Sequence, residues 1–234
     1  MEQETRFAFG NAYGAFFGPS IYSDFYHNAA FQILLSVNND IEVLDNDHNK
    51  KVGRIVLIKP LVKTKIQCIG PATHIYLSPR VSLAFDLIKL AGCSDVHIMT
   101  SENGLPFKAS DSYQKVIEAL ENVDVLPTEG LDSRLLIVLE YLNQNLNNPS
   151  IKEAANQCGL SRSRIRTLAR EQLGVPLSTW VTWRKLIASN RALSSGANLS
   201  EAALAGCFAD QAHFTRTMKK MFGVTPAVAL QVYT

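Results

Sequence analysis

The chain has 234 residues, of which 47% are hydrophobic and 19% are charged. This composition excludes a disordered or fibrous protein, and no run of about 18 apolar residues that could span a bilayer occurs. The N-terminal MEQETRFAFG lacks the basic segment and apolar run of a secretory signal, so we expect a cytoplasmic protein. Four scattered cysteines without a C-x-x-C pair indicate reduced thiols, not a disulfide framework or a zinc site.

Charge is divided unequally along the chain. Residues 1–127 contain 11 Lys and Arg against 14 Asp and Glu, a net charge of −3, whereas residues 128–234 contain 12 against 7, a net charge of +5. A mildly acidic half joined to a basic half suggests that only the second half binds a polyanion. A chance fluctuation would give the same numbers, so charge alone does not decide the matter.

The first half has the pattern of a small antiparallel β-structure. Short apolar or alternating runs are separated by turn sequences, and the predicted strands cover residues 31–37, 41–45, 54–60, 65–69 and 73–79. Gly70-Pro71 is predicted to be a turn between the last two strands. Helical periodicity follows over residues 82–92 and 112–123. These patterns indicate a sandwich or small β-barrel with trailing helices, ending at a boundary near residues 125–130.

The second half has no convincing strand and begins with a predicted helix. Asp132 or Ser133 can cap a helix that runs to about Leu146. Four apolar side chains fall on one face of this helix: Leu135, Val138, Leu139 and Leu142.

An internal near-repeat follows this helix. Residues 151–155 (IKEAA) recur as residues 199–203 (LSEAA), and Gly174-Val175 recurs as Gly223-Val224. Two copies are too few for a solenoid, so the pattern indicates a duplicated supersecondary unit. Each copy has an Ala-rich helix, a tight break and a second helix opened by Ser161 or Asp210. This order is typical of a helix-turn-helix, whose second helix enters the major groove of DNA.

The second helix of each copy has an apolar face and a polar face. In residues 162–172 the predicted buried side chains are Ile165, Leu168 and Ala169, and in residues 211–221 they are Phe214, Met218 and Met221. Arginine and glutamine suit base edges, and serine, threonine and lysine suit phosphates. The candidate DNA-binding residues are therefore Arg162, Ser163, Arg166, Thr167, Arg170, Gln211, Ala212, His213, Arg216, Lys219 and Lys220.

A long apolar segment joins the two copies. Residues 177–196 are predicted to form a helix that ends near Gly196 and buries Trp180, Trp183 or Leu186, and Ile187. A rigid connector would hold the two second helices at a fixed spacing. Two recognition helices about 34 Å apart would enter successive major-groove segments on one face of B-DNA.

These features together resemble the DNA-binding domain of the AraC/XylS family of transcription regulators. The resemblance covers residues 131–226, and its motifs are GLSRSRIRTLAREQLGVPL (159–177) and FADQAHFTRTMKKMFGVTP (208–226). It implies that bases are contacted by Ser163, Arg166, Thr167, Gln211, Ala212, His213 and Arg216.

The sequence departs from the family pattern at several points. Cys207 replaces the usual glycine before Phe208 and would alter the second turn, and Met218 replaces a common phenylalanine. The aromatic-arginine pair that usually follows Pro226 is absent, which puts one phosphate contact in doubt. Ala212 offers a base only a methyl contact.

Residues 27–86 resemble, more loosely, the cupin-like sensor domain of the same family. That resemblance implies a small-molecule effector and dimerisation, and it divides the chain into a sensor domain (1–127) and a DNA-binding domain (131–234). A metal-binding cupin needs clustered ligands, but the barrel offers only His27, His48 and His74, with no H-x-H. We therefore expect neither an enzyme nor a metal or other cofactor, and the sequence names no effector contact.

Two further features of the sequence have alternative interpretations. The helix at 112–123 would form a dimer seam or pack on its own barrel. Cys158 and Cys207 lie at the two helix-turn-helix breaks, where they would be redox sites or buried small residues, and the second is favoured.

The function predicted from the sequence is sequence-specific binding of double-stranded DNA by a transcription regulator, with RNA polymerase and a second copy of the chain as candidate partners. One alternative is a cupin-like enzyme or metal sensor whose basic domain is secondary. Another is an architectural DNA binder with little preference between sequences.

Overall fold

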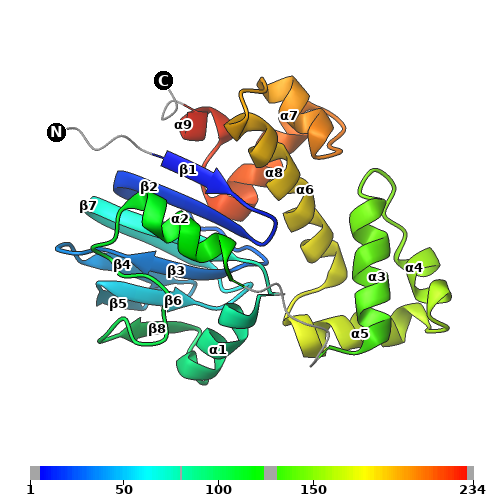
Figure 1. Ribbon diagram of the computed structural model, residues 1–234, viewed down its shortest axis with the longest axis horizontal. Helices are drawn as coiled ribbons and strands as arrows, with labels where there is room; N and C mark the ends of the chain where they lie inside the picture. Colours follow the sequence, from blue (N-terminus) through cyan, green and yellow to red (C-terminus); the bar gives the residue numbers. More distant parts are fainter. Residues whose placement is uncertain (1–5, 80, 124–130, 231–234) are drawn as a thin grey trace.

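The computed structural model describes residues 6–79, 81–123 and 131–230. An antiparallel sheet with two helices comes first, and a group of helices follows (Figure 1). The predicted α+β fold, with the sheet before the helices, is confirmed. The strands are β1 (Arg6–Phe9), β2 (Tyr13–Tyr22), β3 (Phe31–Leu35), β4 (Ile41–Asp45), β5 (Lys50–Gly53), β6 (Ile55–Ile58), β7 (Thr64–Leu77) and β8 (Val96–Met99).

The division of the chain into two domains stays a prediction. The boundary expected near residues 125–130 lies outside the described residues. None of the described helices is long and apolar enough to cross a membrane.

β7 is the centre of the sheet. One of its edges pairs with β2 over most of its length, and the other edge pairs first with β4 and then with β3. β5 extends the sheet beyond β4, while β6 and β8 extend it beyond β3. Side chains on both faces of β3 are buried, which explains why all of its residues except Gln32 are apolar.

The turn predicted at Gly70-Pro71 is wrong, because β7 continues through it. β2 has its own irregularity between Gly18 and Ser20, opposite Gly70-Pro71, so the two strands bend together and remain paired on both sides. Gly70 has a φ of 116°, a backbone conformation that favours glycine. The two predicted strands at 65–69 and 73–79 are therefore two halves of one strand with different neighbours.

Several strands have little signal in the sequence. β2 contains Gly14, Gly18 and Pro19, which weaken strand propensity, yet it pairs with β1 and β7. β5 (KKVG) is short and largely polar, and β8 (VHIM) has only four residues. These segments become strands because β4 and β6 supply paired backbone partners.

Two helices pack on the sheet. α1 (Ser82–Ala91) ends at Gly92 as predicted, and α2 (Tyr113–Glu121) lies across the sheet in Figure 1. The apolar side chains of α2 join those of β3 and β7 in one buried cluster. Of the two interpretations of this helix, the structure favours packing on its own sheet over a dimer seam, because its apolar face is already covered.

The second half of the described chain is helical. Its elements are α3 (Ser133–Gln144), α4 (Ile151–Gln157), α5 (Arg162–Leu173), α6 (Leu177–Ser194), α7 (Leu199–Ala205), α8 (Gln211–Phe222) and α9 (Pro226–Leu230). The Asp132 side chain caps α3 by accepting a hydrogen bond from the Arg134 amide at 2.9 Å. The four apolar residues predicted on one face of α3 are all buried. The connector predicted over residues 177–196 is α6, with Trp180, Trp183, Leu186 and Ile187 buried.

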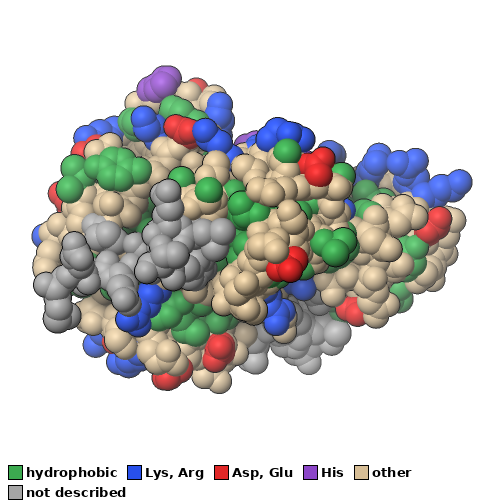
Figure 2. All heavy atoms as spheres, turned by 90° about the horizontal axis from the view of Figure 1, so that it is seen from above, with side chains coloured by type: hydrophobic (Ala, Val, Ile, Leu, Met, Phe, Trp, Pro, Cys, Tyr) green, Lys and Arg blue, Asp and Glu red, His purple; other side chains and the backbone are tan. Residues whose placement is uncertain are grey.

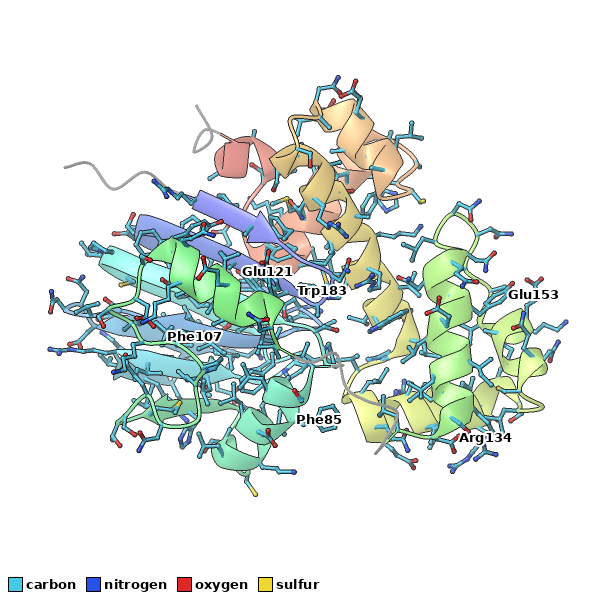
Figure 3. All side chains as sticks on the ribbon, in the orientation of Figure 1. Phe85, Phe107, Glu121, Arg134, Glu153 and Trp183 are labelled. Carbon is cyan, nitrogen blue, oxygen red and sulfur yellow. The ribbon has the colours of Figure 1, made fainter. Side chains whose placement is uncertain are left out.

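The sheet packs against the C-terminal helices. Trp183 of α6 lies where the connector meets the strands (Figure 3), with its ring centroid 6.3 Å from that of Tyr76 on β7. Phe222 of α8 lies 4.8 Å from Tyr76, edge to face, and 5.5 Å from Trp183. Arg191 of α6 donates to the Asn11 side chain at 2.7 Å. These contacts attach the sheet to the connector and α8, whereas α3 and α4 lie on the far side of α6 in Figure 1.

Candidate nucleic-acid interface

The first helix-turn-helix unit consists of α4 and α5. The Ser150 hydroxyl accepts from the Glu153 amide at 3.2 Å and caps α4, and the Ser161 hydroxyl accepts from the Arg164 amide at 3.2 Å and caps α5. Gly159 lies between the helices with a φ of 67°, where a side chain would be strained. The break and the cap predicted from the sequence are both present.

α5 has one buried face and one exposed face. Ile165, Leu168 and Ala169 are buried as predicted. The candidate DNA-binding residues of this helix are all exposed: Arg162, Ser163, Arg166, Thr167 and Arg170. Among the described residues, no carboxylate lies within ion-pair distance of Arg162, Arg166 or Arg170. Their guanidinium groups are therefore available to phosphates or to guanine edges.

The second unit repeats the backbone of the first turn. In the first unit the amides of Gly159 and Leu160 donate to the carbonyls of Asn156 and Ala155. The equivalent amides of Cys207 and Phe208 donate to the carbonyls of Leu204 and Ala203, 48 positions further on in each case.

Cys207 keeps the turn that a glycine would make. Its φ is 53°, close to the 67° of Gly159, so the substitution strains the backbone without changing the turn. Its carbonyl accepts a hydrogen bond from Nζ of Lys185, on α6, at 3.0 Å. The expectation that Cys207 alters the second turn is therefore wrong for the path of the backbone. Cys158 and Cys207 are both half-buried free thiols.

α8 begins at a strong cap and carries the second set of candidate residues. The Asp210 carboxylate accepts from the His213 amide at 2.6 Å, and the His213 ring meets the Phe208 ring edge to face at 5.3 Å. Phe214, Met218 and Met221 are buried as predicted. The candidate residues of this helix are all exposed: Gln211, Ala212, His213, Arg216, Lys219 and Lys220.

The C-terminal end of α8 also faces the sheet. Nζ of Lys219 lies 3.3 Å from the Asp24 carboxylate, in the segment that follows β2. The pKa of His27 is lowered by partial burial and then by the positive charges of Lys220 and Lys63. Lys219 and Lys220 therefore lie where the recognition helix and the sheet meet, whereas Gln211 and Ala212 begin α8 at its opposite end.

Basic side chains are spread over the surface of the molecule. Figure 2 shows Lys and Arg side chains along the upper edge of the view and others at its lower left, with a few acidic side chains among them. Exposed basic side chains on α5 and α8 are suited to the phosphate backbone of nucleic acid.

The three histidines of the first half lie in different surroundings. His48 is exposed at the tip of the β4–β5 turn, with a φ of 61°. His27 is half-buried, and His74 is buried in β7. Among the described residues, no three His, Cys, Asp or Glu side chains gather as metal ligands would.

A cavity that the sequence did not reveal lies between the sheet and the second unit. It has a volume of about 280 Å³ and is lined by residues of β1, β2, β7, α8 and α9. Phe7 and Phe9 are two positions apart on β1, so their side chains lie on the same face of the strand. This spacing is the signal in the sequence that could have placed them together. The partner residues lie about 200 positions further along the chain, which no local pattern connects.

Two helix-turn-helix units on one connector helix define a DNA-binding type of domain. A family model described as a helix-turn-helix domain matches residues 154–231. YkgA of Escherichia coli strain K12, named for an inferred role as an HTH-type transcriptional regulator, is 34% identical over 91 residues. The aligned segment covers 38% of this chain and 38% of YkgA, so the chain matches well under half of that relative.

Solved structures of ToxT from Vibrio cholerae have a similar overall fold. One crystal structure is 13% identical and covers 98% of this chain and 99% of ToxT, with a TM-score of 0.58. A structure of unsaturated-fatty-acid-bound ToxT is 10% identical and covers 96% of this chain and 97% of ToxT, with a TM-score of 0.57. Residues 154–231 thus match a helix-turn-helix domain, and the chain shares the two-part architecture of ToxT.

Proposed function

We propose that the protein is a transcription regulator that binds specific sequences of double-stranded DNA. The observation that supports this best is the pair of turns with equivalent hydrogen bonds, each followed by a capped helix with an exposed polar face. One continuous helix, α6, joins the two units, so their spacing is fixed. Such a pair would read two major-groove segments on one side of a duplex.

Different residues are assigned to affinity and to sequence reading. We assign base contacts to Ser163, Arg166 and Thr167 in the first unit, and to Gln211, Ala212, His213 and Arg216 in the second. The remaining candidates, Arg162, Arg170, Lys219 and Lys220, are assigned to phosphates, which supply affinity without sequence preference. DNA is therefore the primary partner, and catalysis is no part of the proposal.

We also propose that a small molecule modulates the protein from its N-terminal part. The cavity between the sheet and α8 supports this, because an occupant would contact both. The existence of a ToxT structure with bound unsaturated fatty acid supports a ligand role for this architecture. The helix-turn-helix family model matches residues 154–231 and does not include the sheet, so this part of the proposal depends on the cavity.

Selection of binding sites from a random duplex pool tests the proposed DNA binding. The purified full chain should enrich two short blocks about one helical turn, roughly 34 Å, apart at near-physiological salt. Strong binding with no enrichment would instead support an architectural, non-specific DNA binder. Absence of DNA binding, both alone and with cell extract added to supply an effector, would contradict the proposal.

A further inference from the structure

The walls of the cavity between the sheet and the second unit are largely apolar. Phe7, Phe9 and Phe16 contribute from β1 and β2, and Met218 and Phe222 contribute from α8. The volume of about 280 Å³ is close to the lower end of the roughly 300–1,000 Å³ of small-molecule sites. The cavity therefore has the size and lining to hold a small molecule with a substantial apolar body.

The described lining of this cavity offers a ligand no charged side chain. Among the described residues that line it there is no Lys, Arg, Asp or Glu. A carboxylate or an ammonium group that entered would lose its water without gaining an ion-pair partner, which is costly in an apolar site. The lining thus disfavours a ligand that is ionised at neutral pH.

One wall of the cavity carries a buried polar network. Tyr26, His74 and Tyr76 line the cavity, and Gln32 lies behind them. The Tyr26 hydroxyl donates to Oε1 of Gln32, and Nε2 of His74 lies 2.9 Å from the same oxygen. Burial lowers the pKa of His74 to about 3, so this ring is neutral at physiological pH.

The hydroxyl and imidazole donors of this network are already used within the protein. Because Oε1 of Gln32 can only accept, Nε2 of His74 carries the proton and donates to it. Nδ1 of the neutral ring is then an acceptor and receives the hydroxyl proton of Tyr76 at 3.2 Å. The two tyrosine oxygens keep lone pairs, so they offer a ligand acceptors and favour a hydroxyl or N–H group over a carboxylate.

We propose that the cavity binds an uncharged, largely apolar small molecule that carries a hydroxyl or similar hydrogen-bond donor. Such a ligand would contact Phe16 on the sheet and Phe222 on the recognition helix at once, so binding would favour the docked position of α8. A ligand shifts such an equilibrium only by its differential contacts with the two states. The regulatory part of this inference rests on the proposed function, whereas the binding itself does not.

Three probes with one skeleton and different charge test the ligand class. Calorimetric titration of the full chain with para-butylbenzyl alcohol, para-butylbenzoic acid and para-butylbenzylamine compares a neutral, an anionic and a cationic group at neutral pH. The alcohol should bind at least about tenfold more tightly than either ion. Equal or tighter binding of the acid or the amine would overturn the proposal, as would failure of all three to bind.

Two matched substitutions test the location. Val228 lines the cavity from α9 and is 53% exposed, so Val228→Trp should fill part of the space without disturbing a core. Val52 on β5 is 43% exposed and does not line this cavity, which makes Val52→Trp the control. Alcohol binding should weaken at least about tenfold in Val228→Trp and stay unchanged in Val52→Trp. Equal binding by both variants would place the site elsewhere.

A third variant tests the polar wall. Tyr76→Phe removes one acceptor oxygen and keeps the ring that meets Phe222, so alcohol binding should weaken by about fivefold. Unchanged affinity would show that the hydroxyl group is not held by this network. Site selection on the same preparations keeps the two proposals separate: enrichment of DNA sites without probe binding refutes only the cavity, and probe binding without DNA binding refutes only the regulator.

Discussion

The two helix-turn-helix units have the same turn but different surroundings. Both turns make equivalent backbone hydrogen bonds, yet the order of glycine and cysteine is exchanged between them, Cys158-Gly159 in the first and Gly206-Cys207 in the second. The second recognition helix also packs on the sheet through Phe222, whereas the described contacts of α5 are with α3, α4 and α6. The same backbone turn is therefore kept by two different sets of side chains.

The space around position 206 explains why the second unit has glycine before cysteine, whereas the first unit has cysteine before glycine. A Cβ added at Gly206 would lie 2.0 Å from Oγ of Ser189 and 2.5 Å from the carbonyl oxygen of Lys185, both on α6. Close approach of α6 and α7 therefore requires glycine at position 206. The residue with the left-handed backbone conformation in this turn is then Cys207. In the first unit the glycine is free to occupy the left-handed position.

The largest change in stability is expected from a substitution in the core of the first unit. Leu168→Ala removes a side chain that is 3% exposed and should lower the free energy of unfolding by about 2–5 kcal/mol. Urea unfolding followed by circular dichroism measures this change. The exposed neighbour in Arg170→Ala should change stability by less than about 0.5 kcal/mol. Unchanged stability of Leu168→Ala would mean that the buried face of α5 is assigned incorrectly.

Gly206→Ala should destabilise the second unit more than a matched change destabilises the first. The added methyl group has no space against α6, so we expect a loss of about 1–3 kcal/mol in the same unfolding assay. Cys158→Ala is the matched change in the first unit and should cost less, because a side chain already fits there. Equal losses at both positions would remove the distinction between the two turns.

Cys207→Gly should stabilise the protein. The variant relieves a left-handed backbone at φ 53° that costs roughly 1–2 kcal/mol for a side-chain-bearing residue, partly offset by the extra freedom of glycine in the unfolded chain. We expect a net gain of about 0.5–1 kcal/mol. Cys158→Gly, at an ordinary φ of −115°, should instead lose stability. A destabilised Cys207→Gly would show that the thiol makes a contact worth more than the strain.

The smallest expected effect concerns the ion pair between the sheet and α8. Asp24 and Lys219 have side chains that are 73% and 55% exposed, and such pairs contribute about 0–1 kcal/mol. Asp24→Asn should therefore change DNA affinity by no more than about fivefold, as measured by fluorescence anisotropy at physiological salt. A much larger change would show that this pair, and not the aromatic contact, controls how α8 is held.

Local features of the helical half could be read from the sequence. Ser161 and Asp210 cap the helices that their spacing predicted, and Ile165 and Phe214 are buried as the helical period required. Caps and amphipathic faces depend on residues within a few positions, so the sequence contains their signal.

Non-local features could not be read in the same way. The four residues of β8 become a strand only through pairing with β6, and Gly70-Pro71 stays within β7 because β2 bends with it. The cavity joins Phe7 to Phe222, which no local pattern relates. Candidate DNA-binding residues were thus placed by periodicity, while the contacts that hold the second unit required the fold.

Site selection with one variant of each unit tests whether both recognition helices read bases. Arg166→Ala and Arg216→Ala remove exposed arginines at the middle of α5 and α8, and each should cost about 1–3 kcal/mol at the best site. We expect each variant to relax a different one of two sequence blocks about one helical turn apart. Relaxation of the same block by both variants, or equal loss of affinity on every sequence, would contradict the claim that both units read bases.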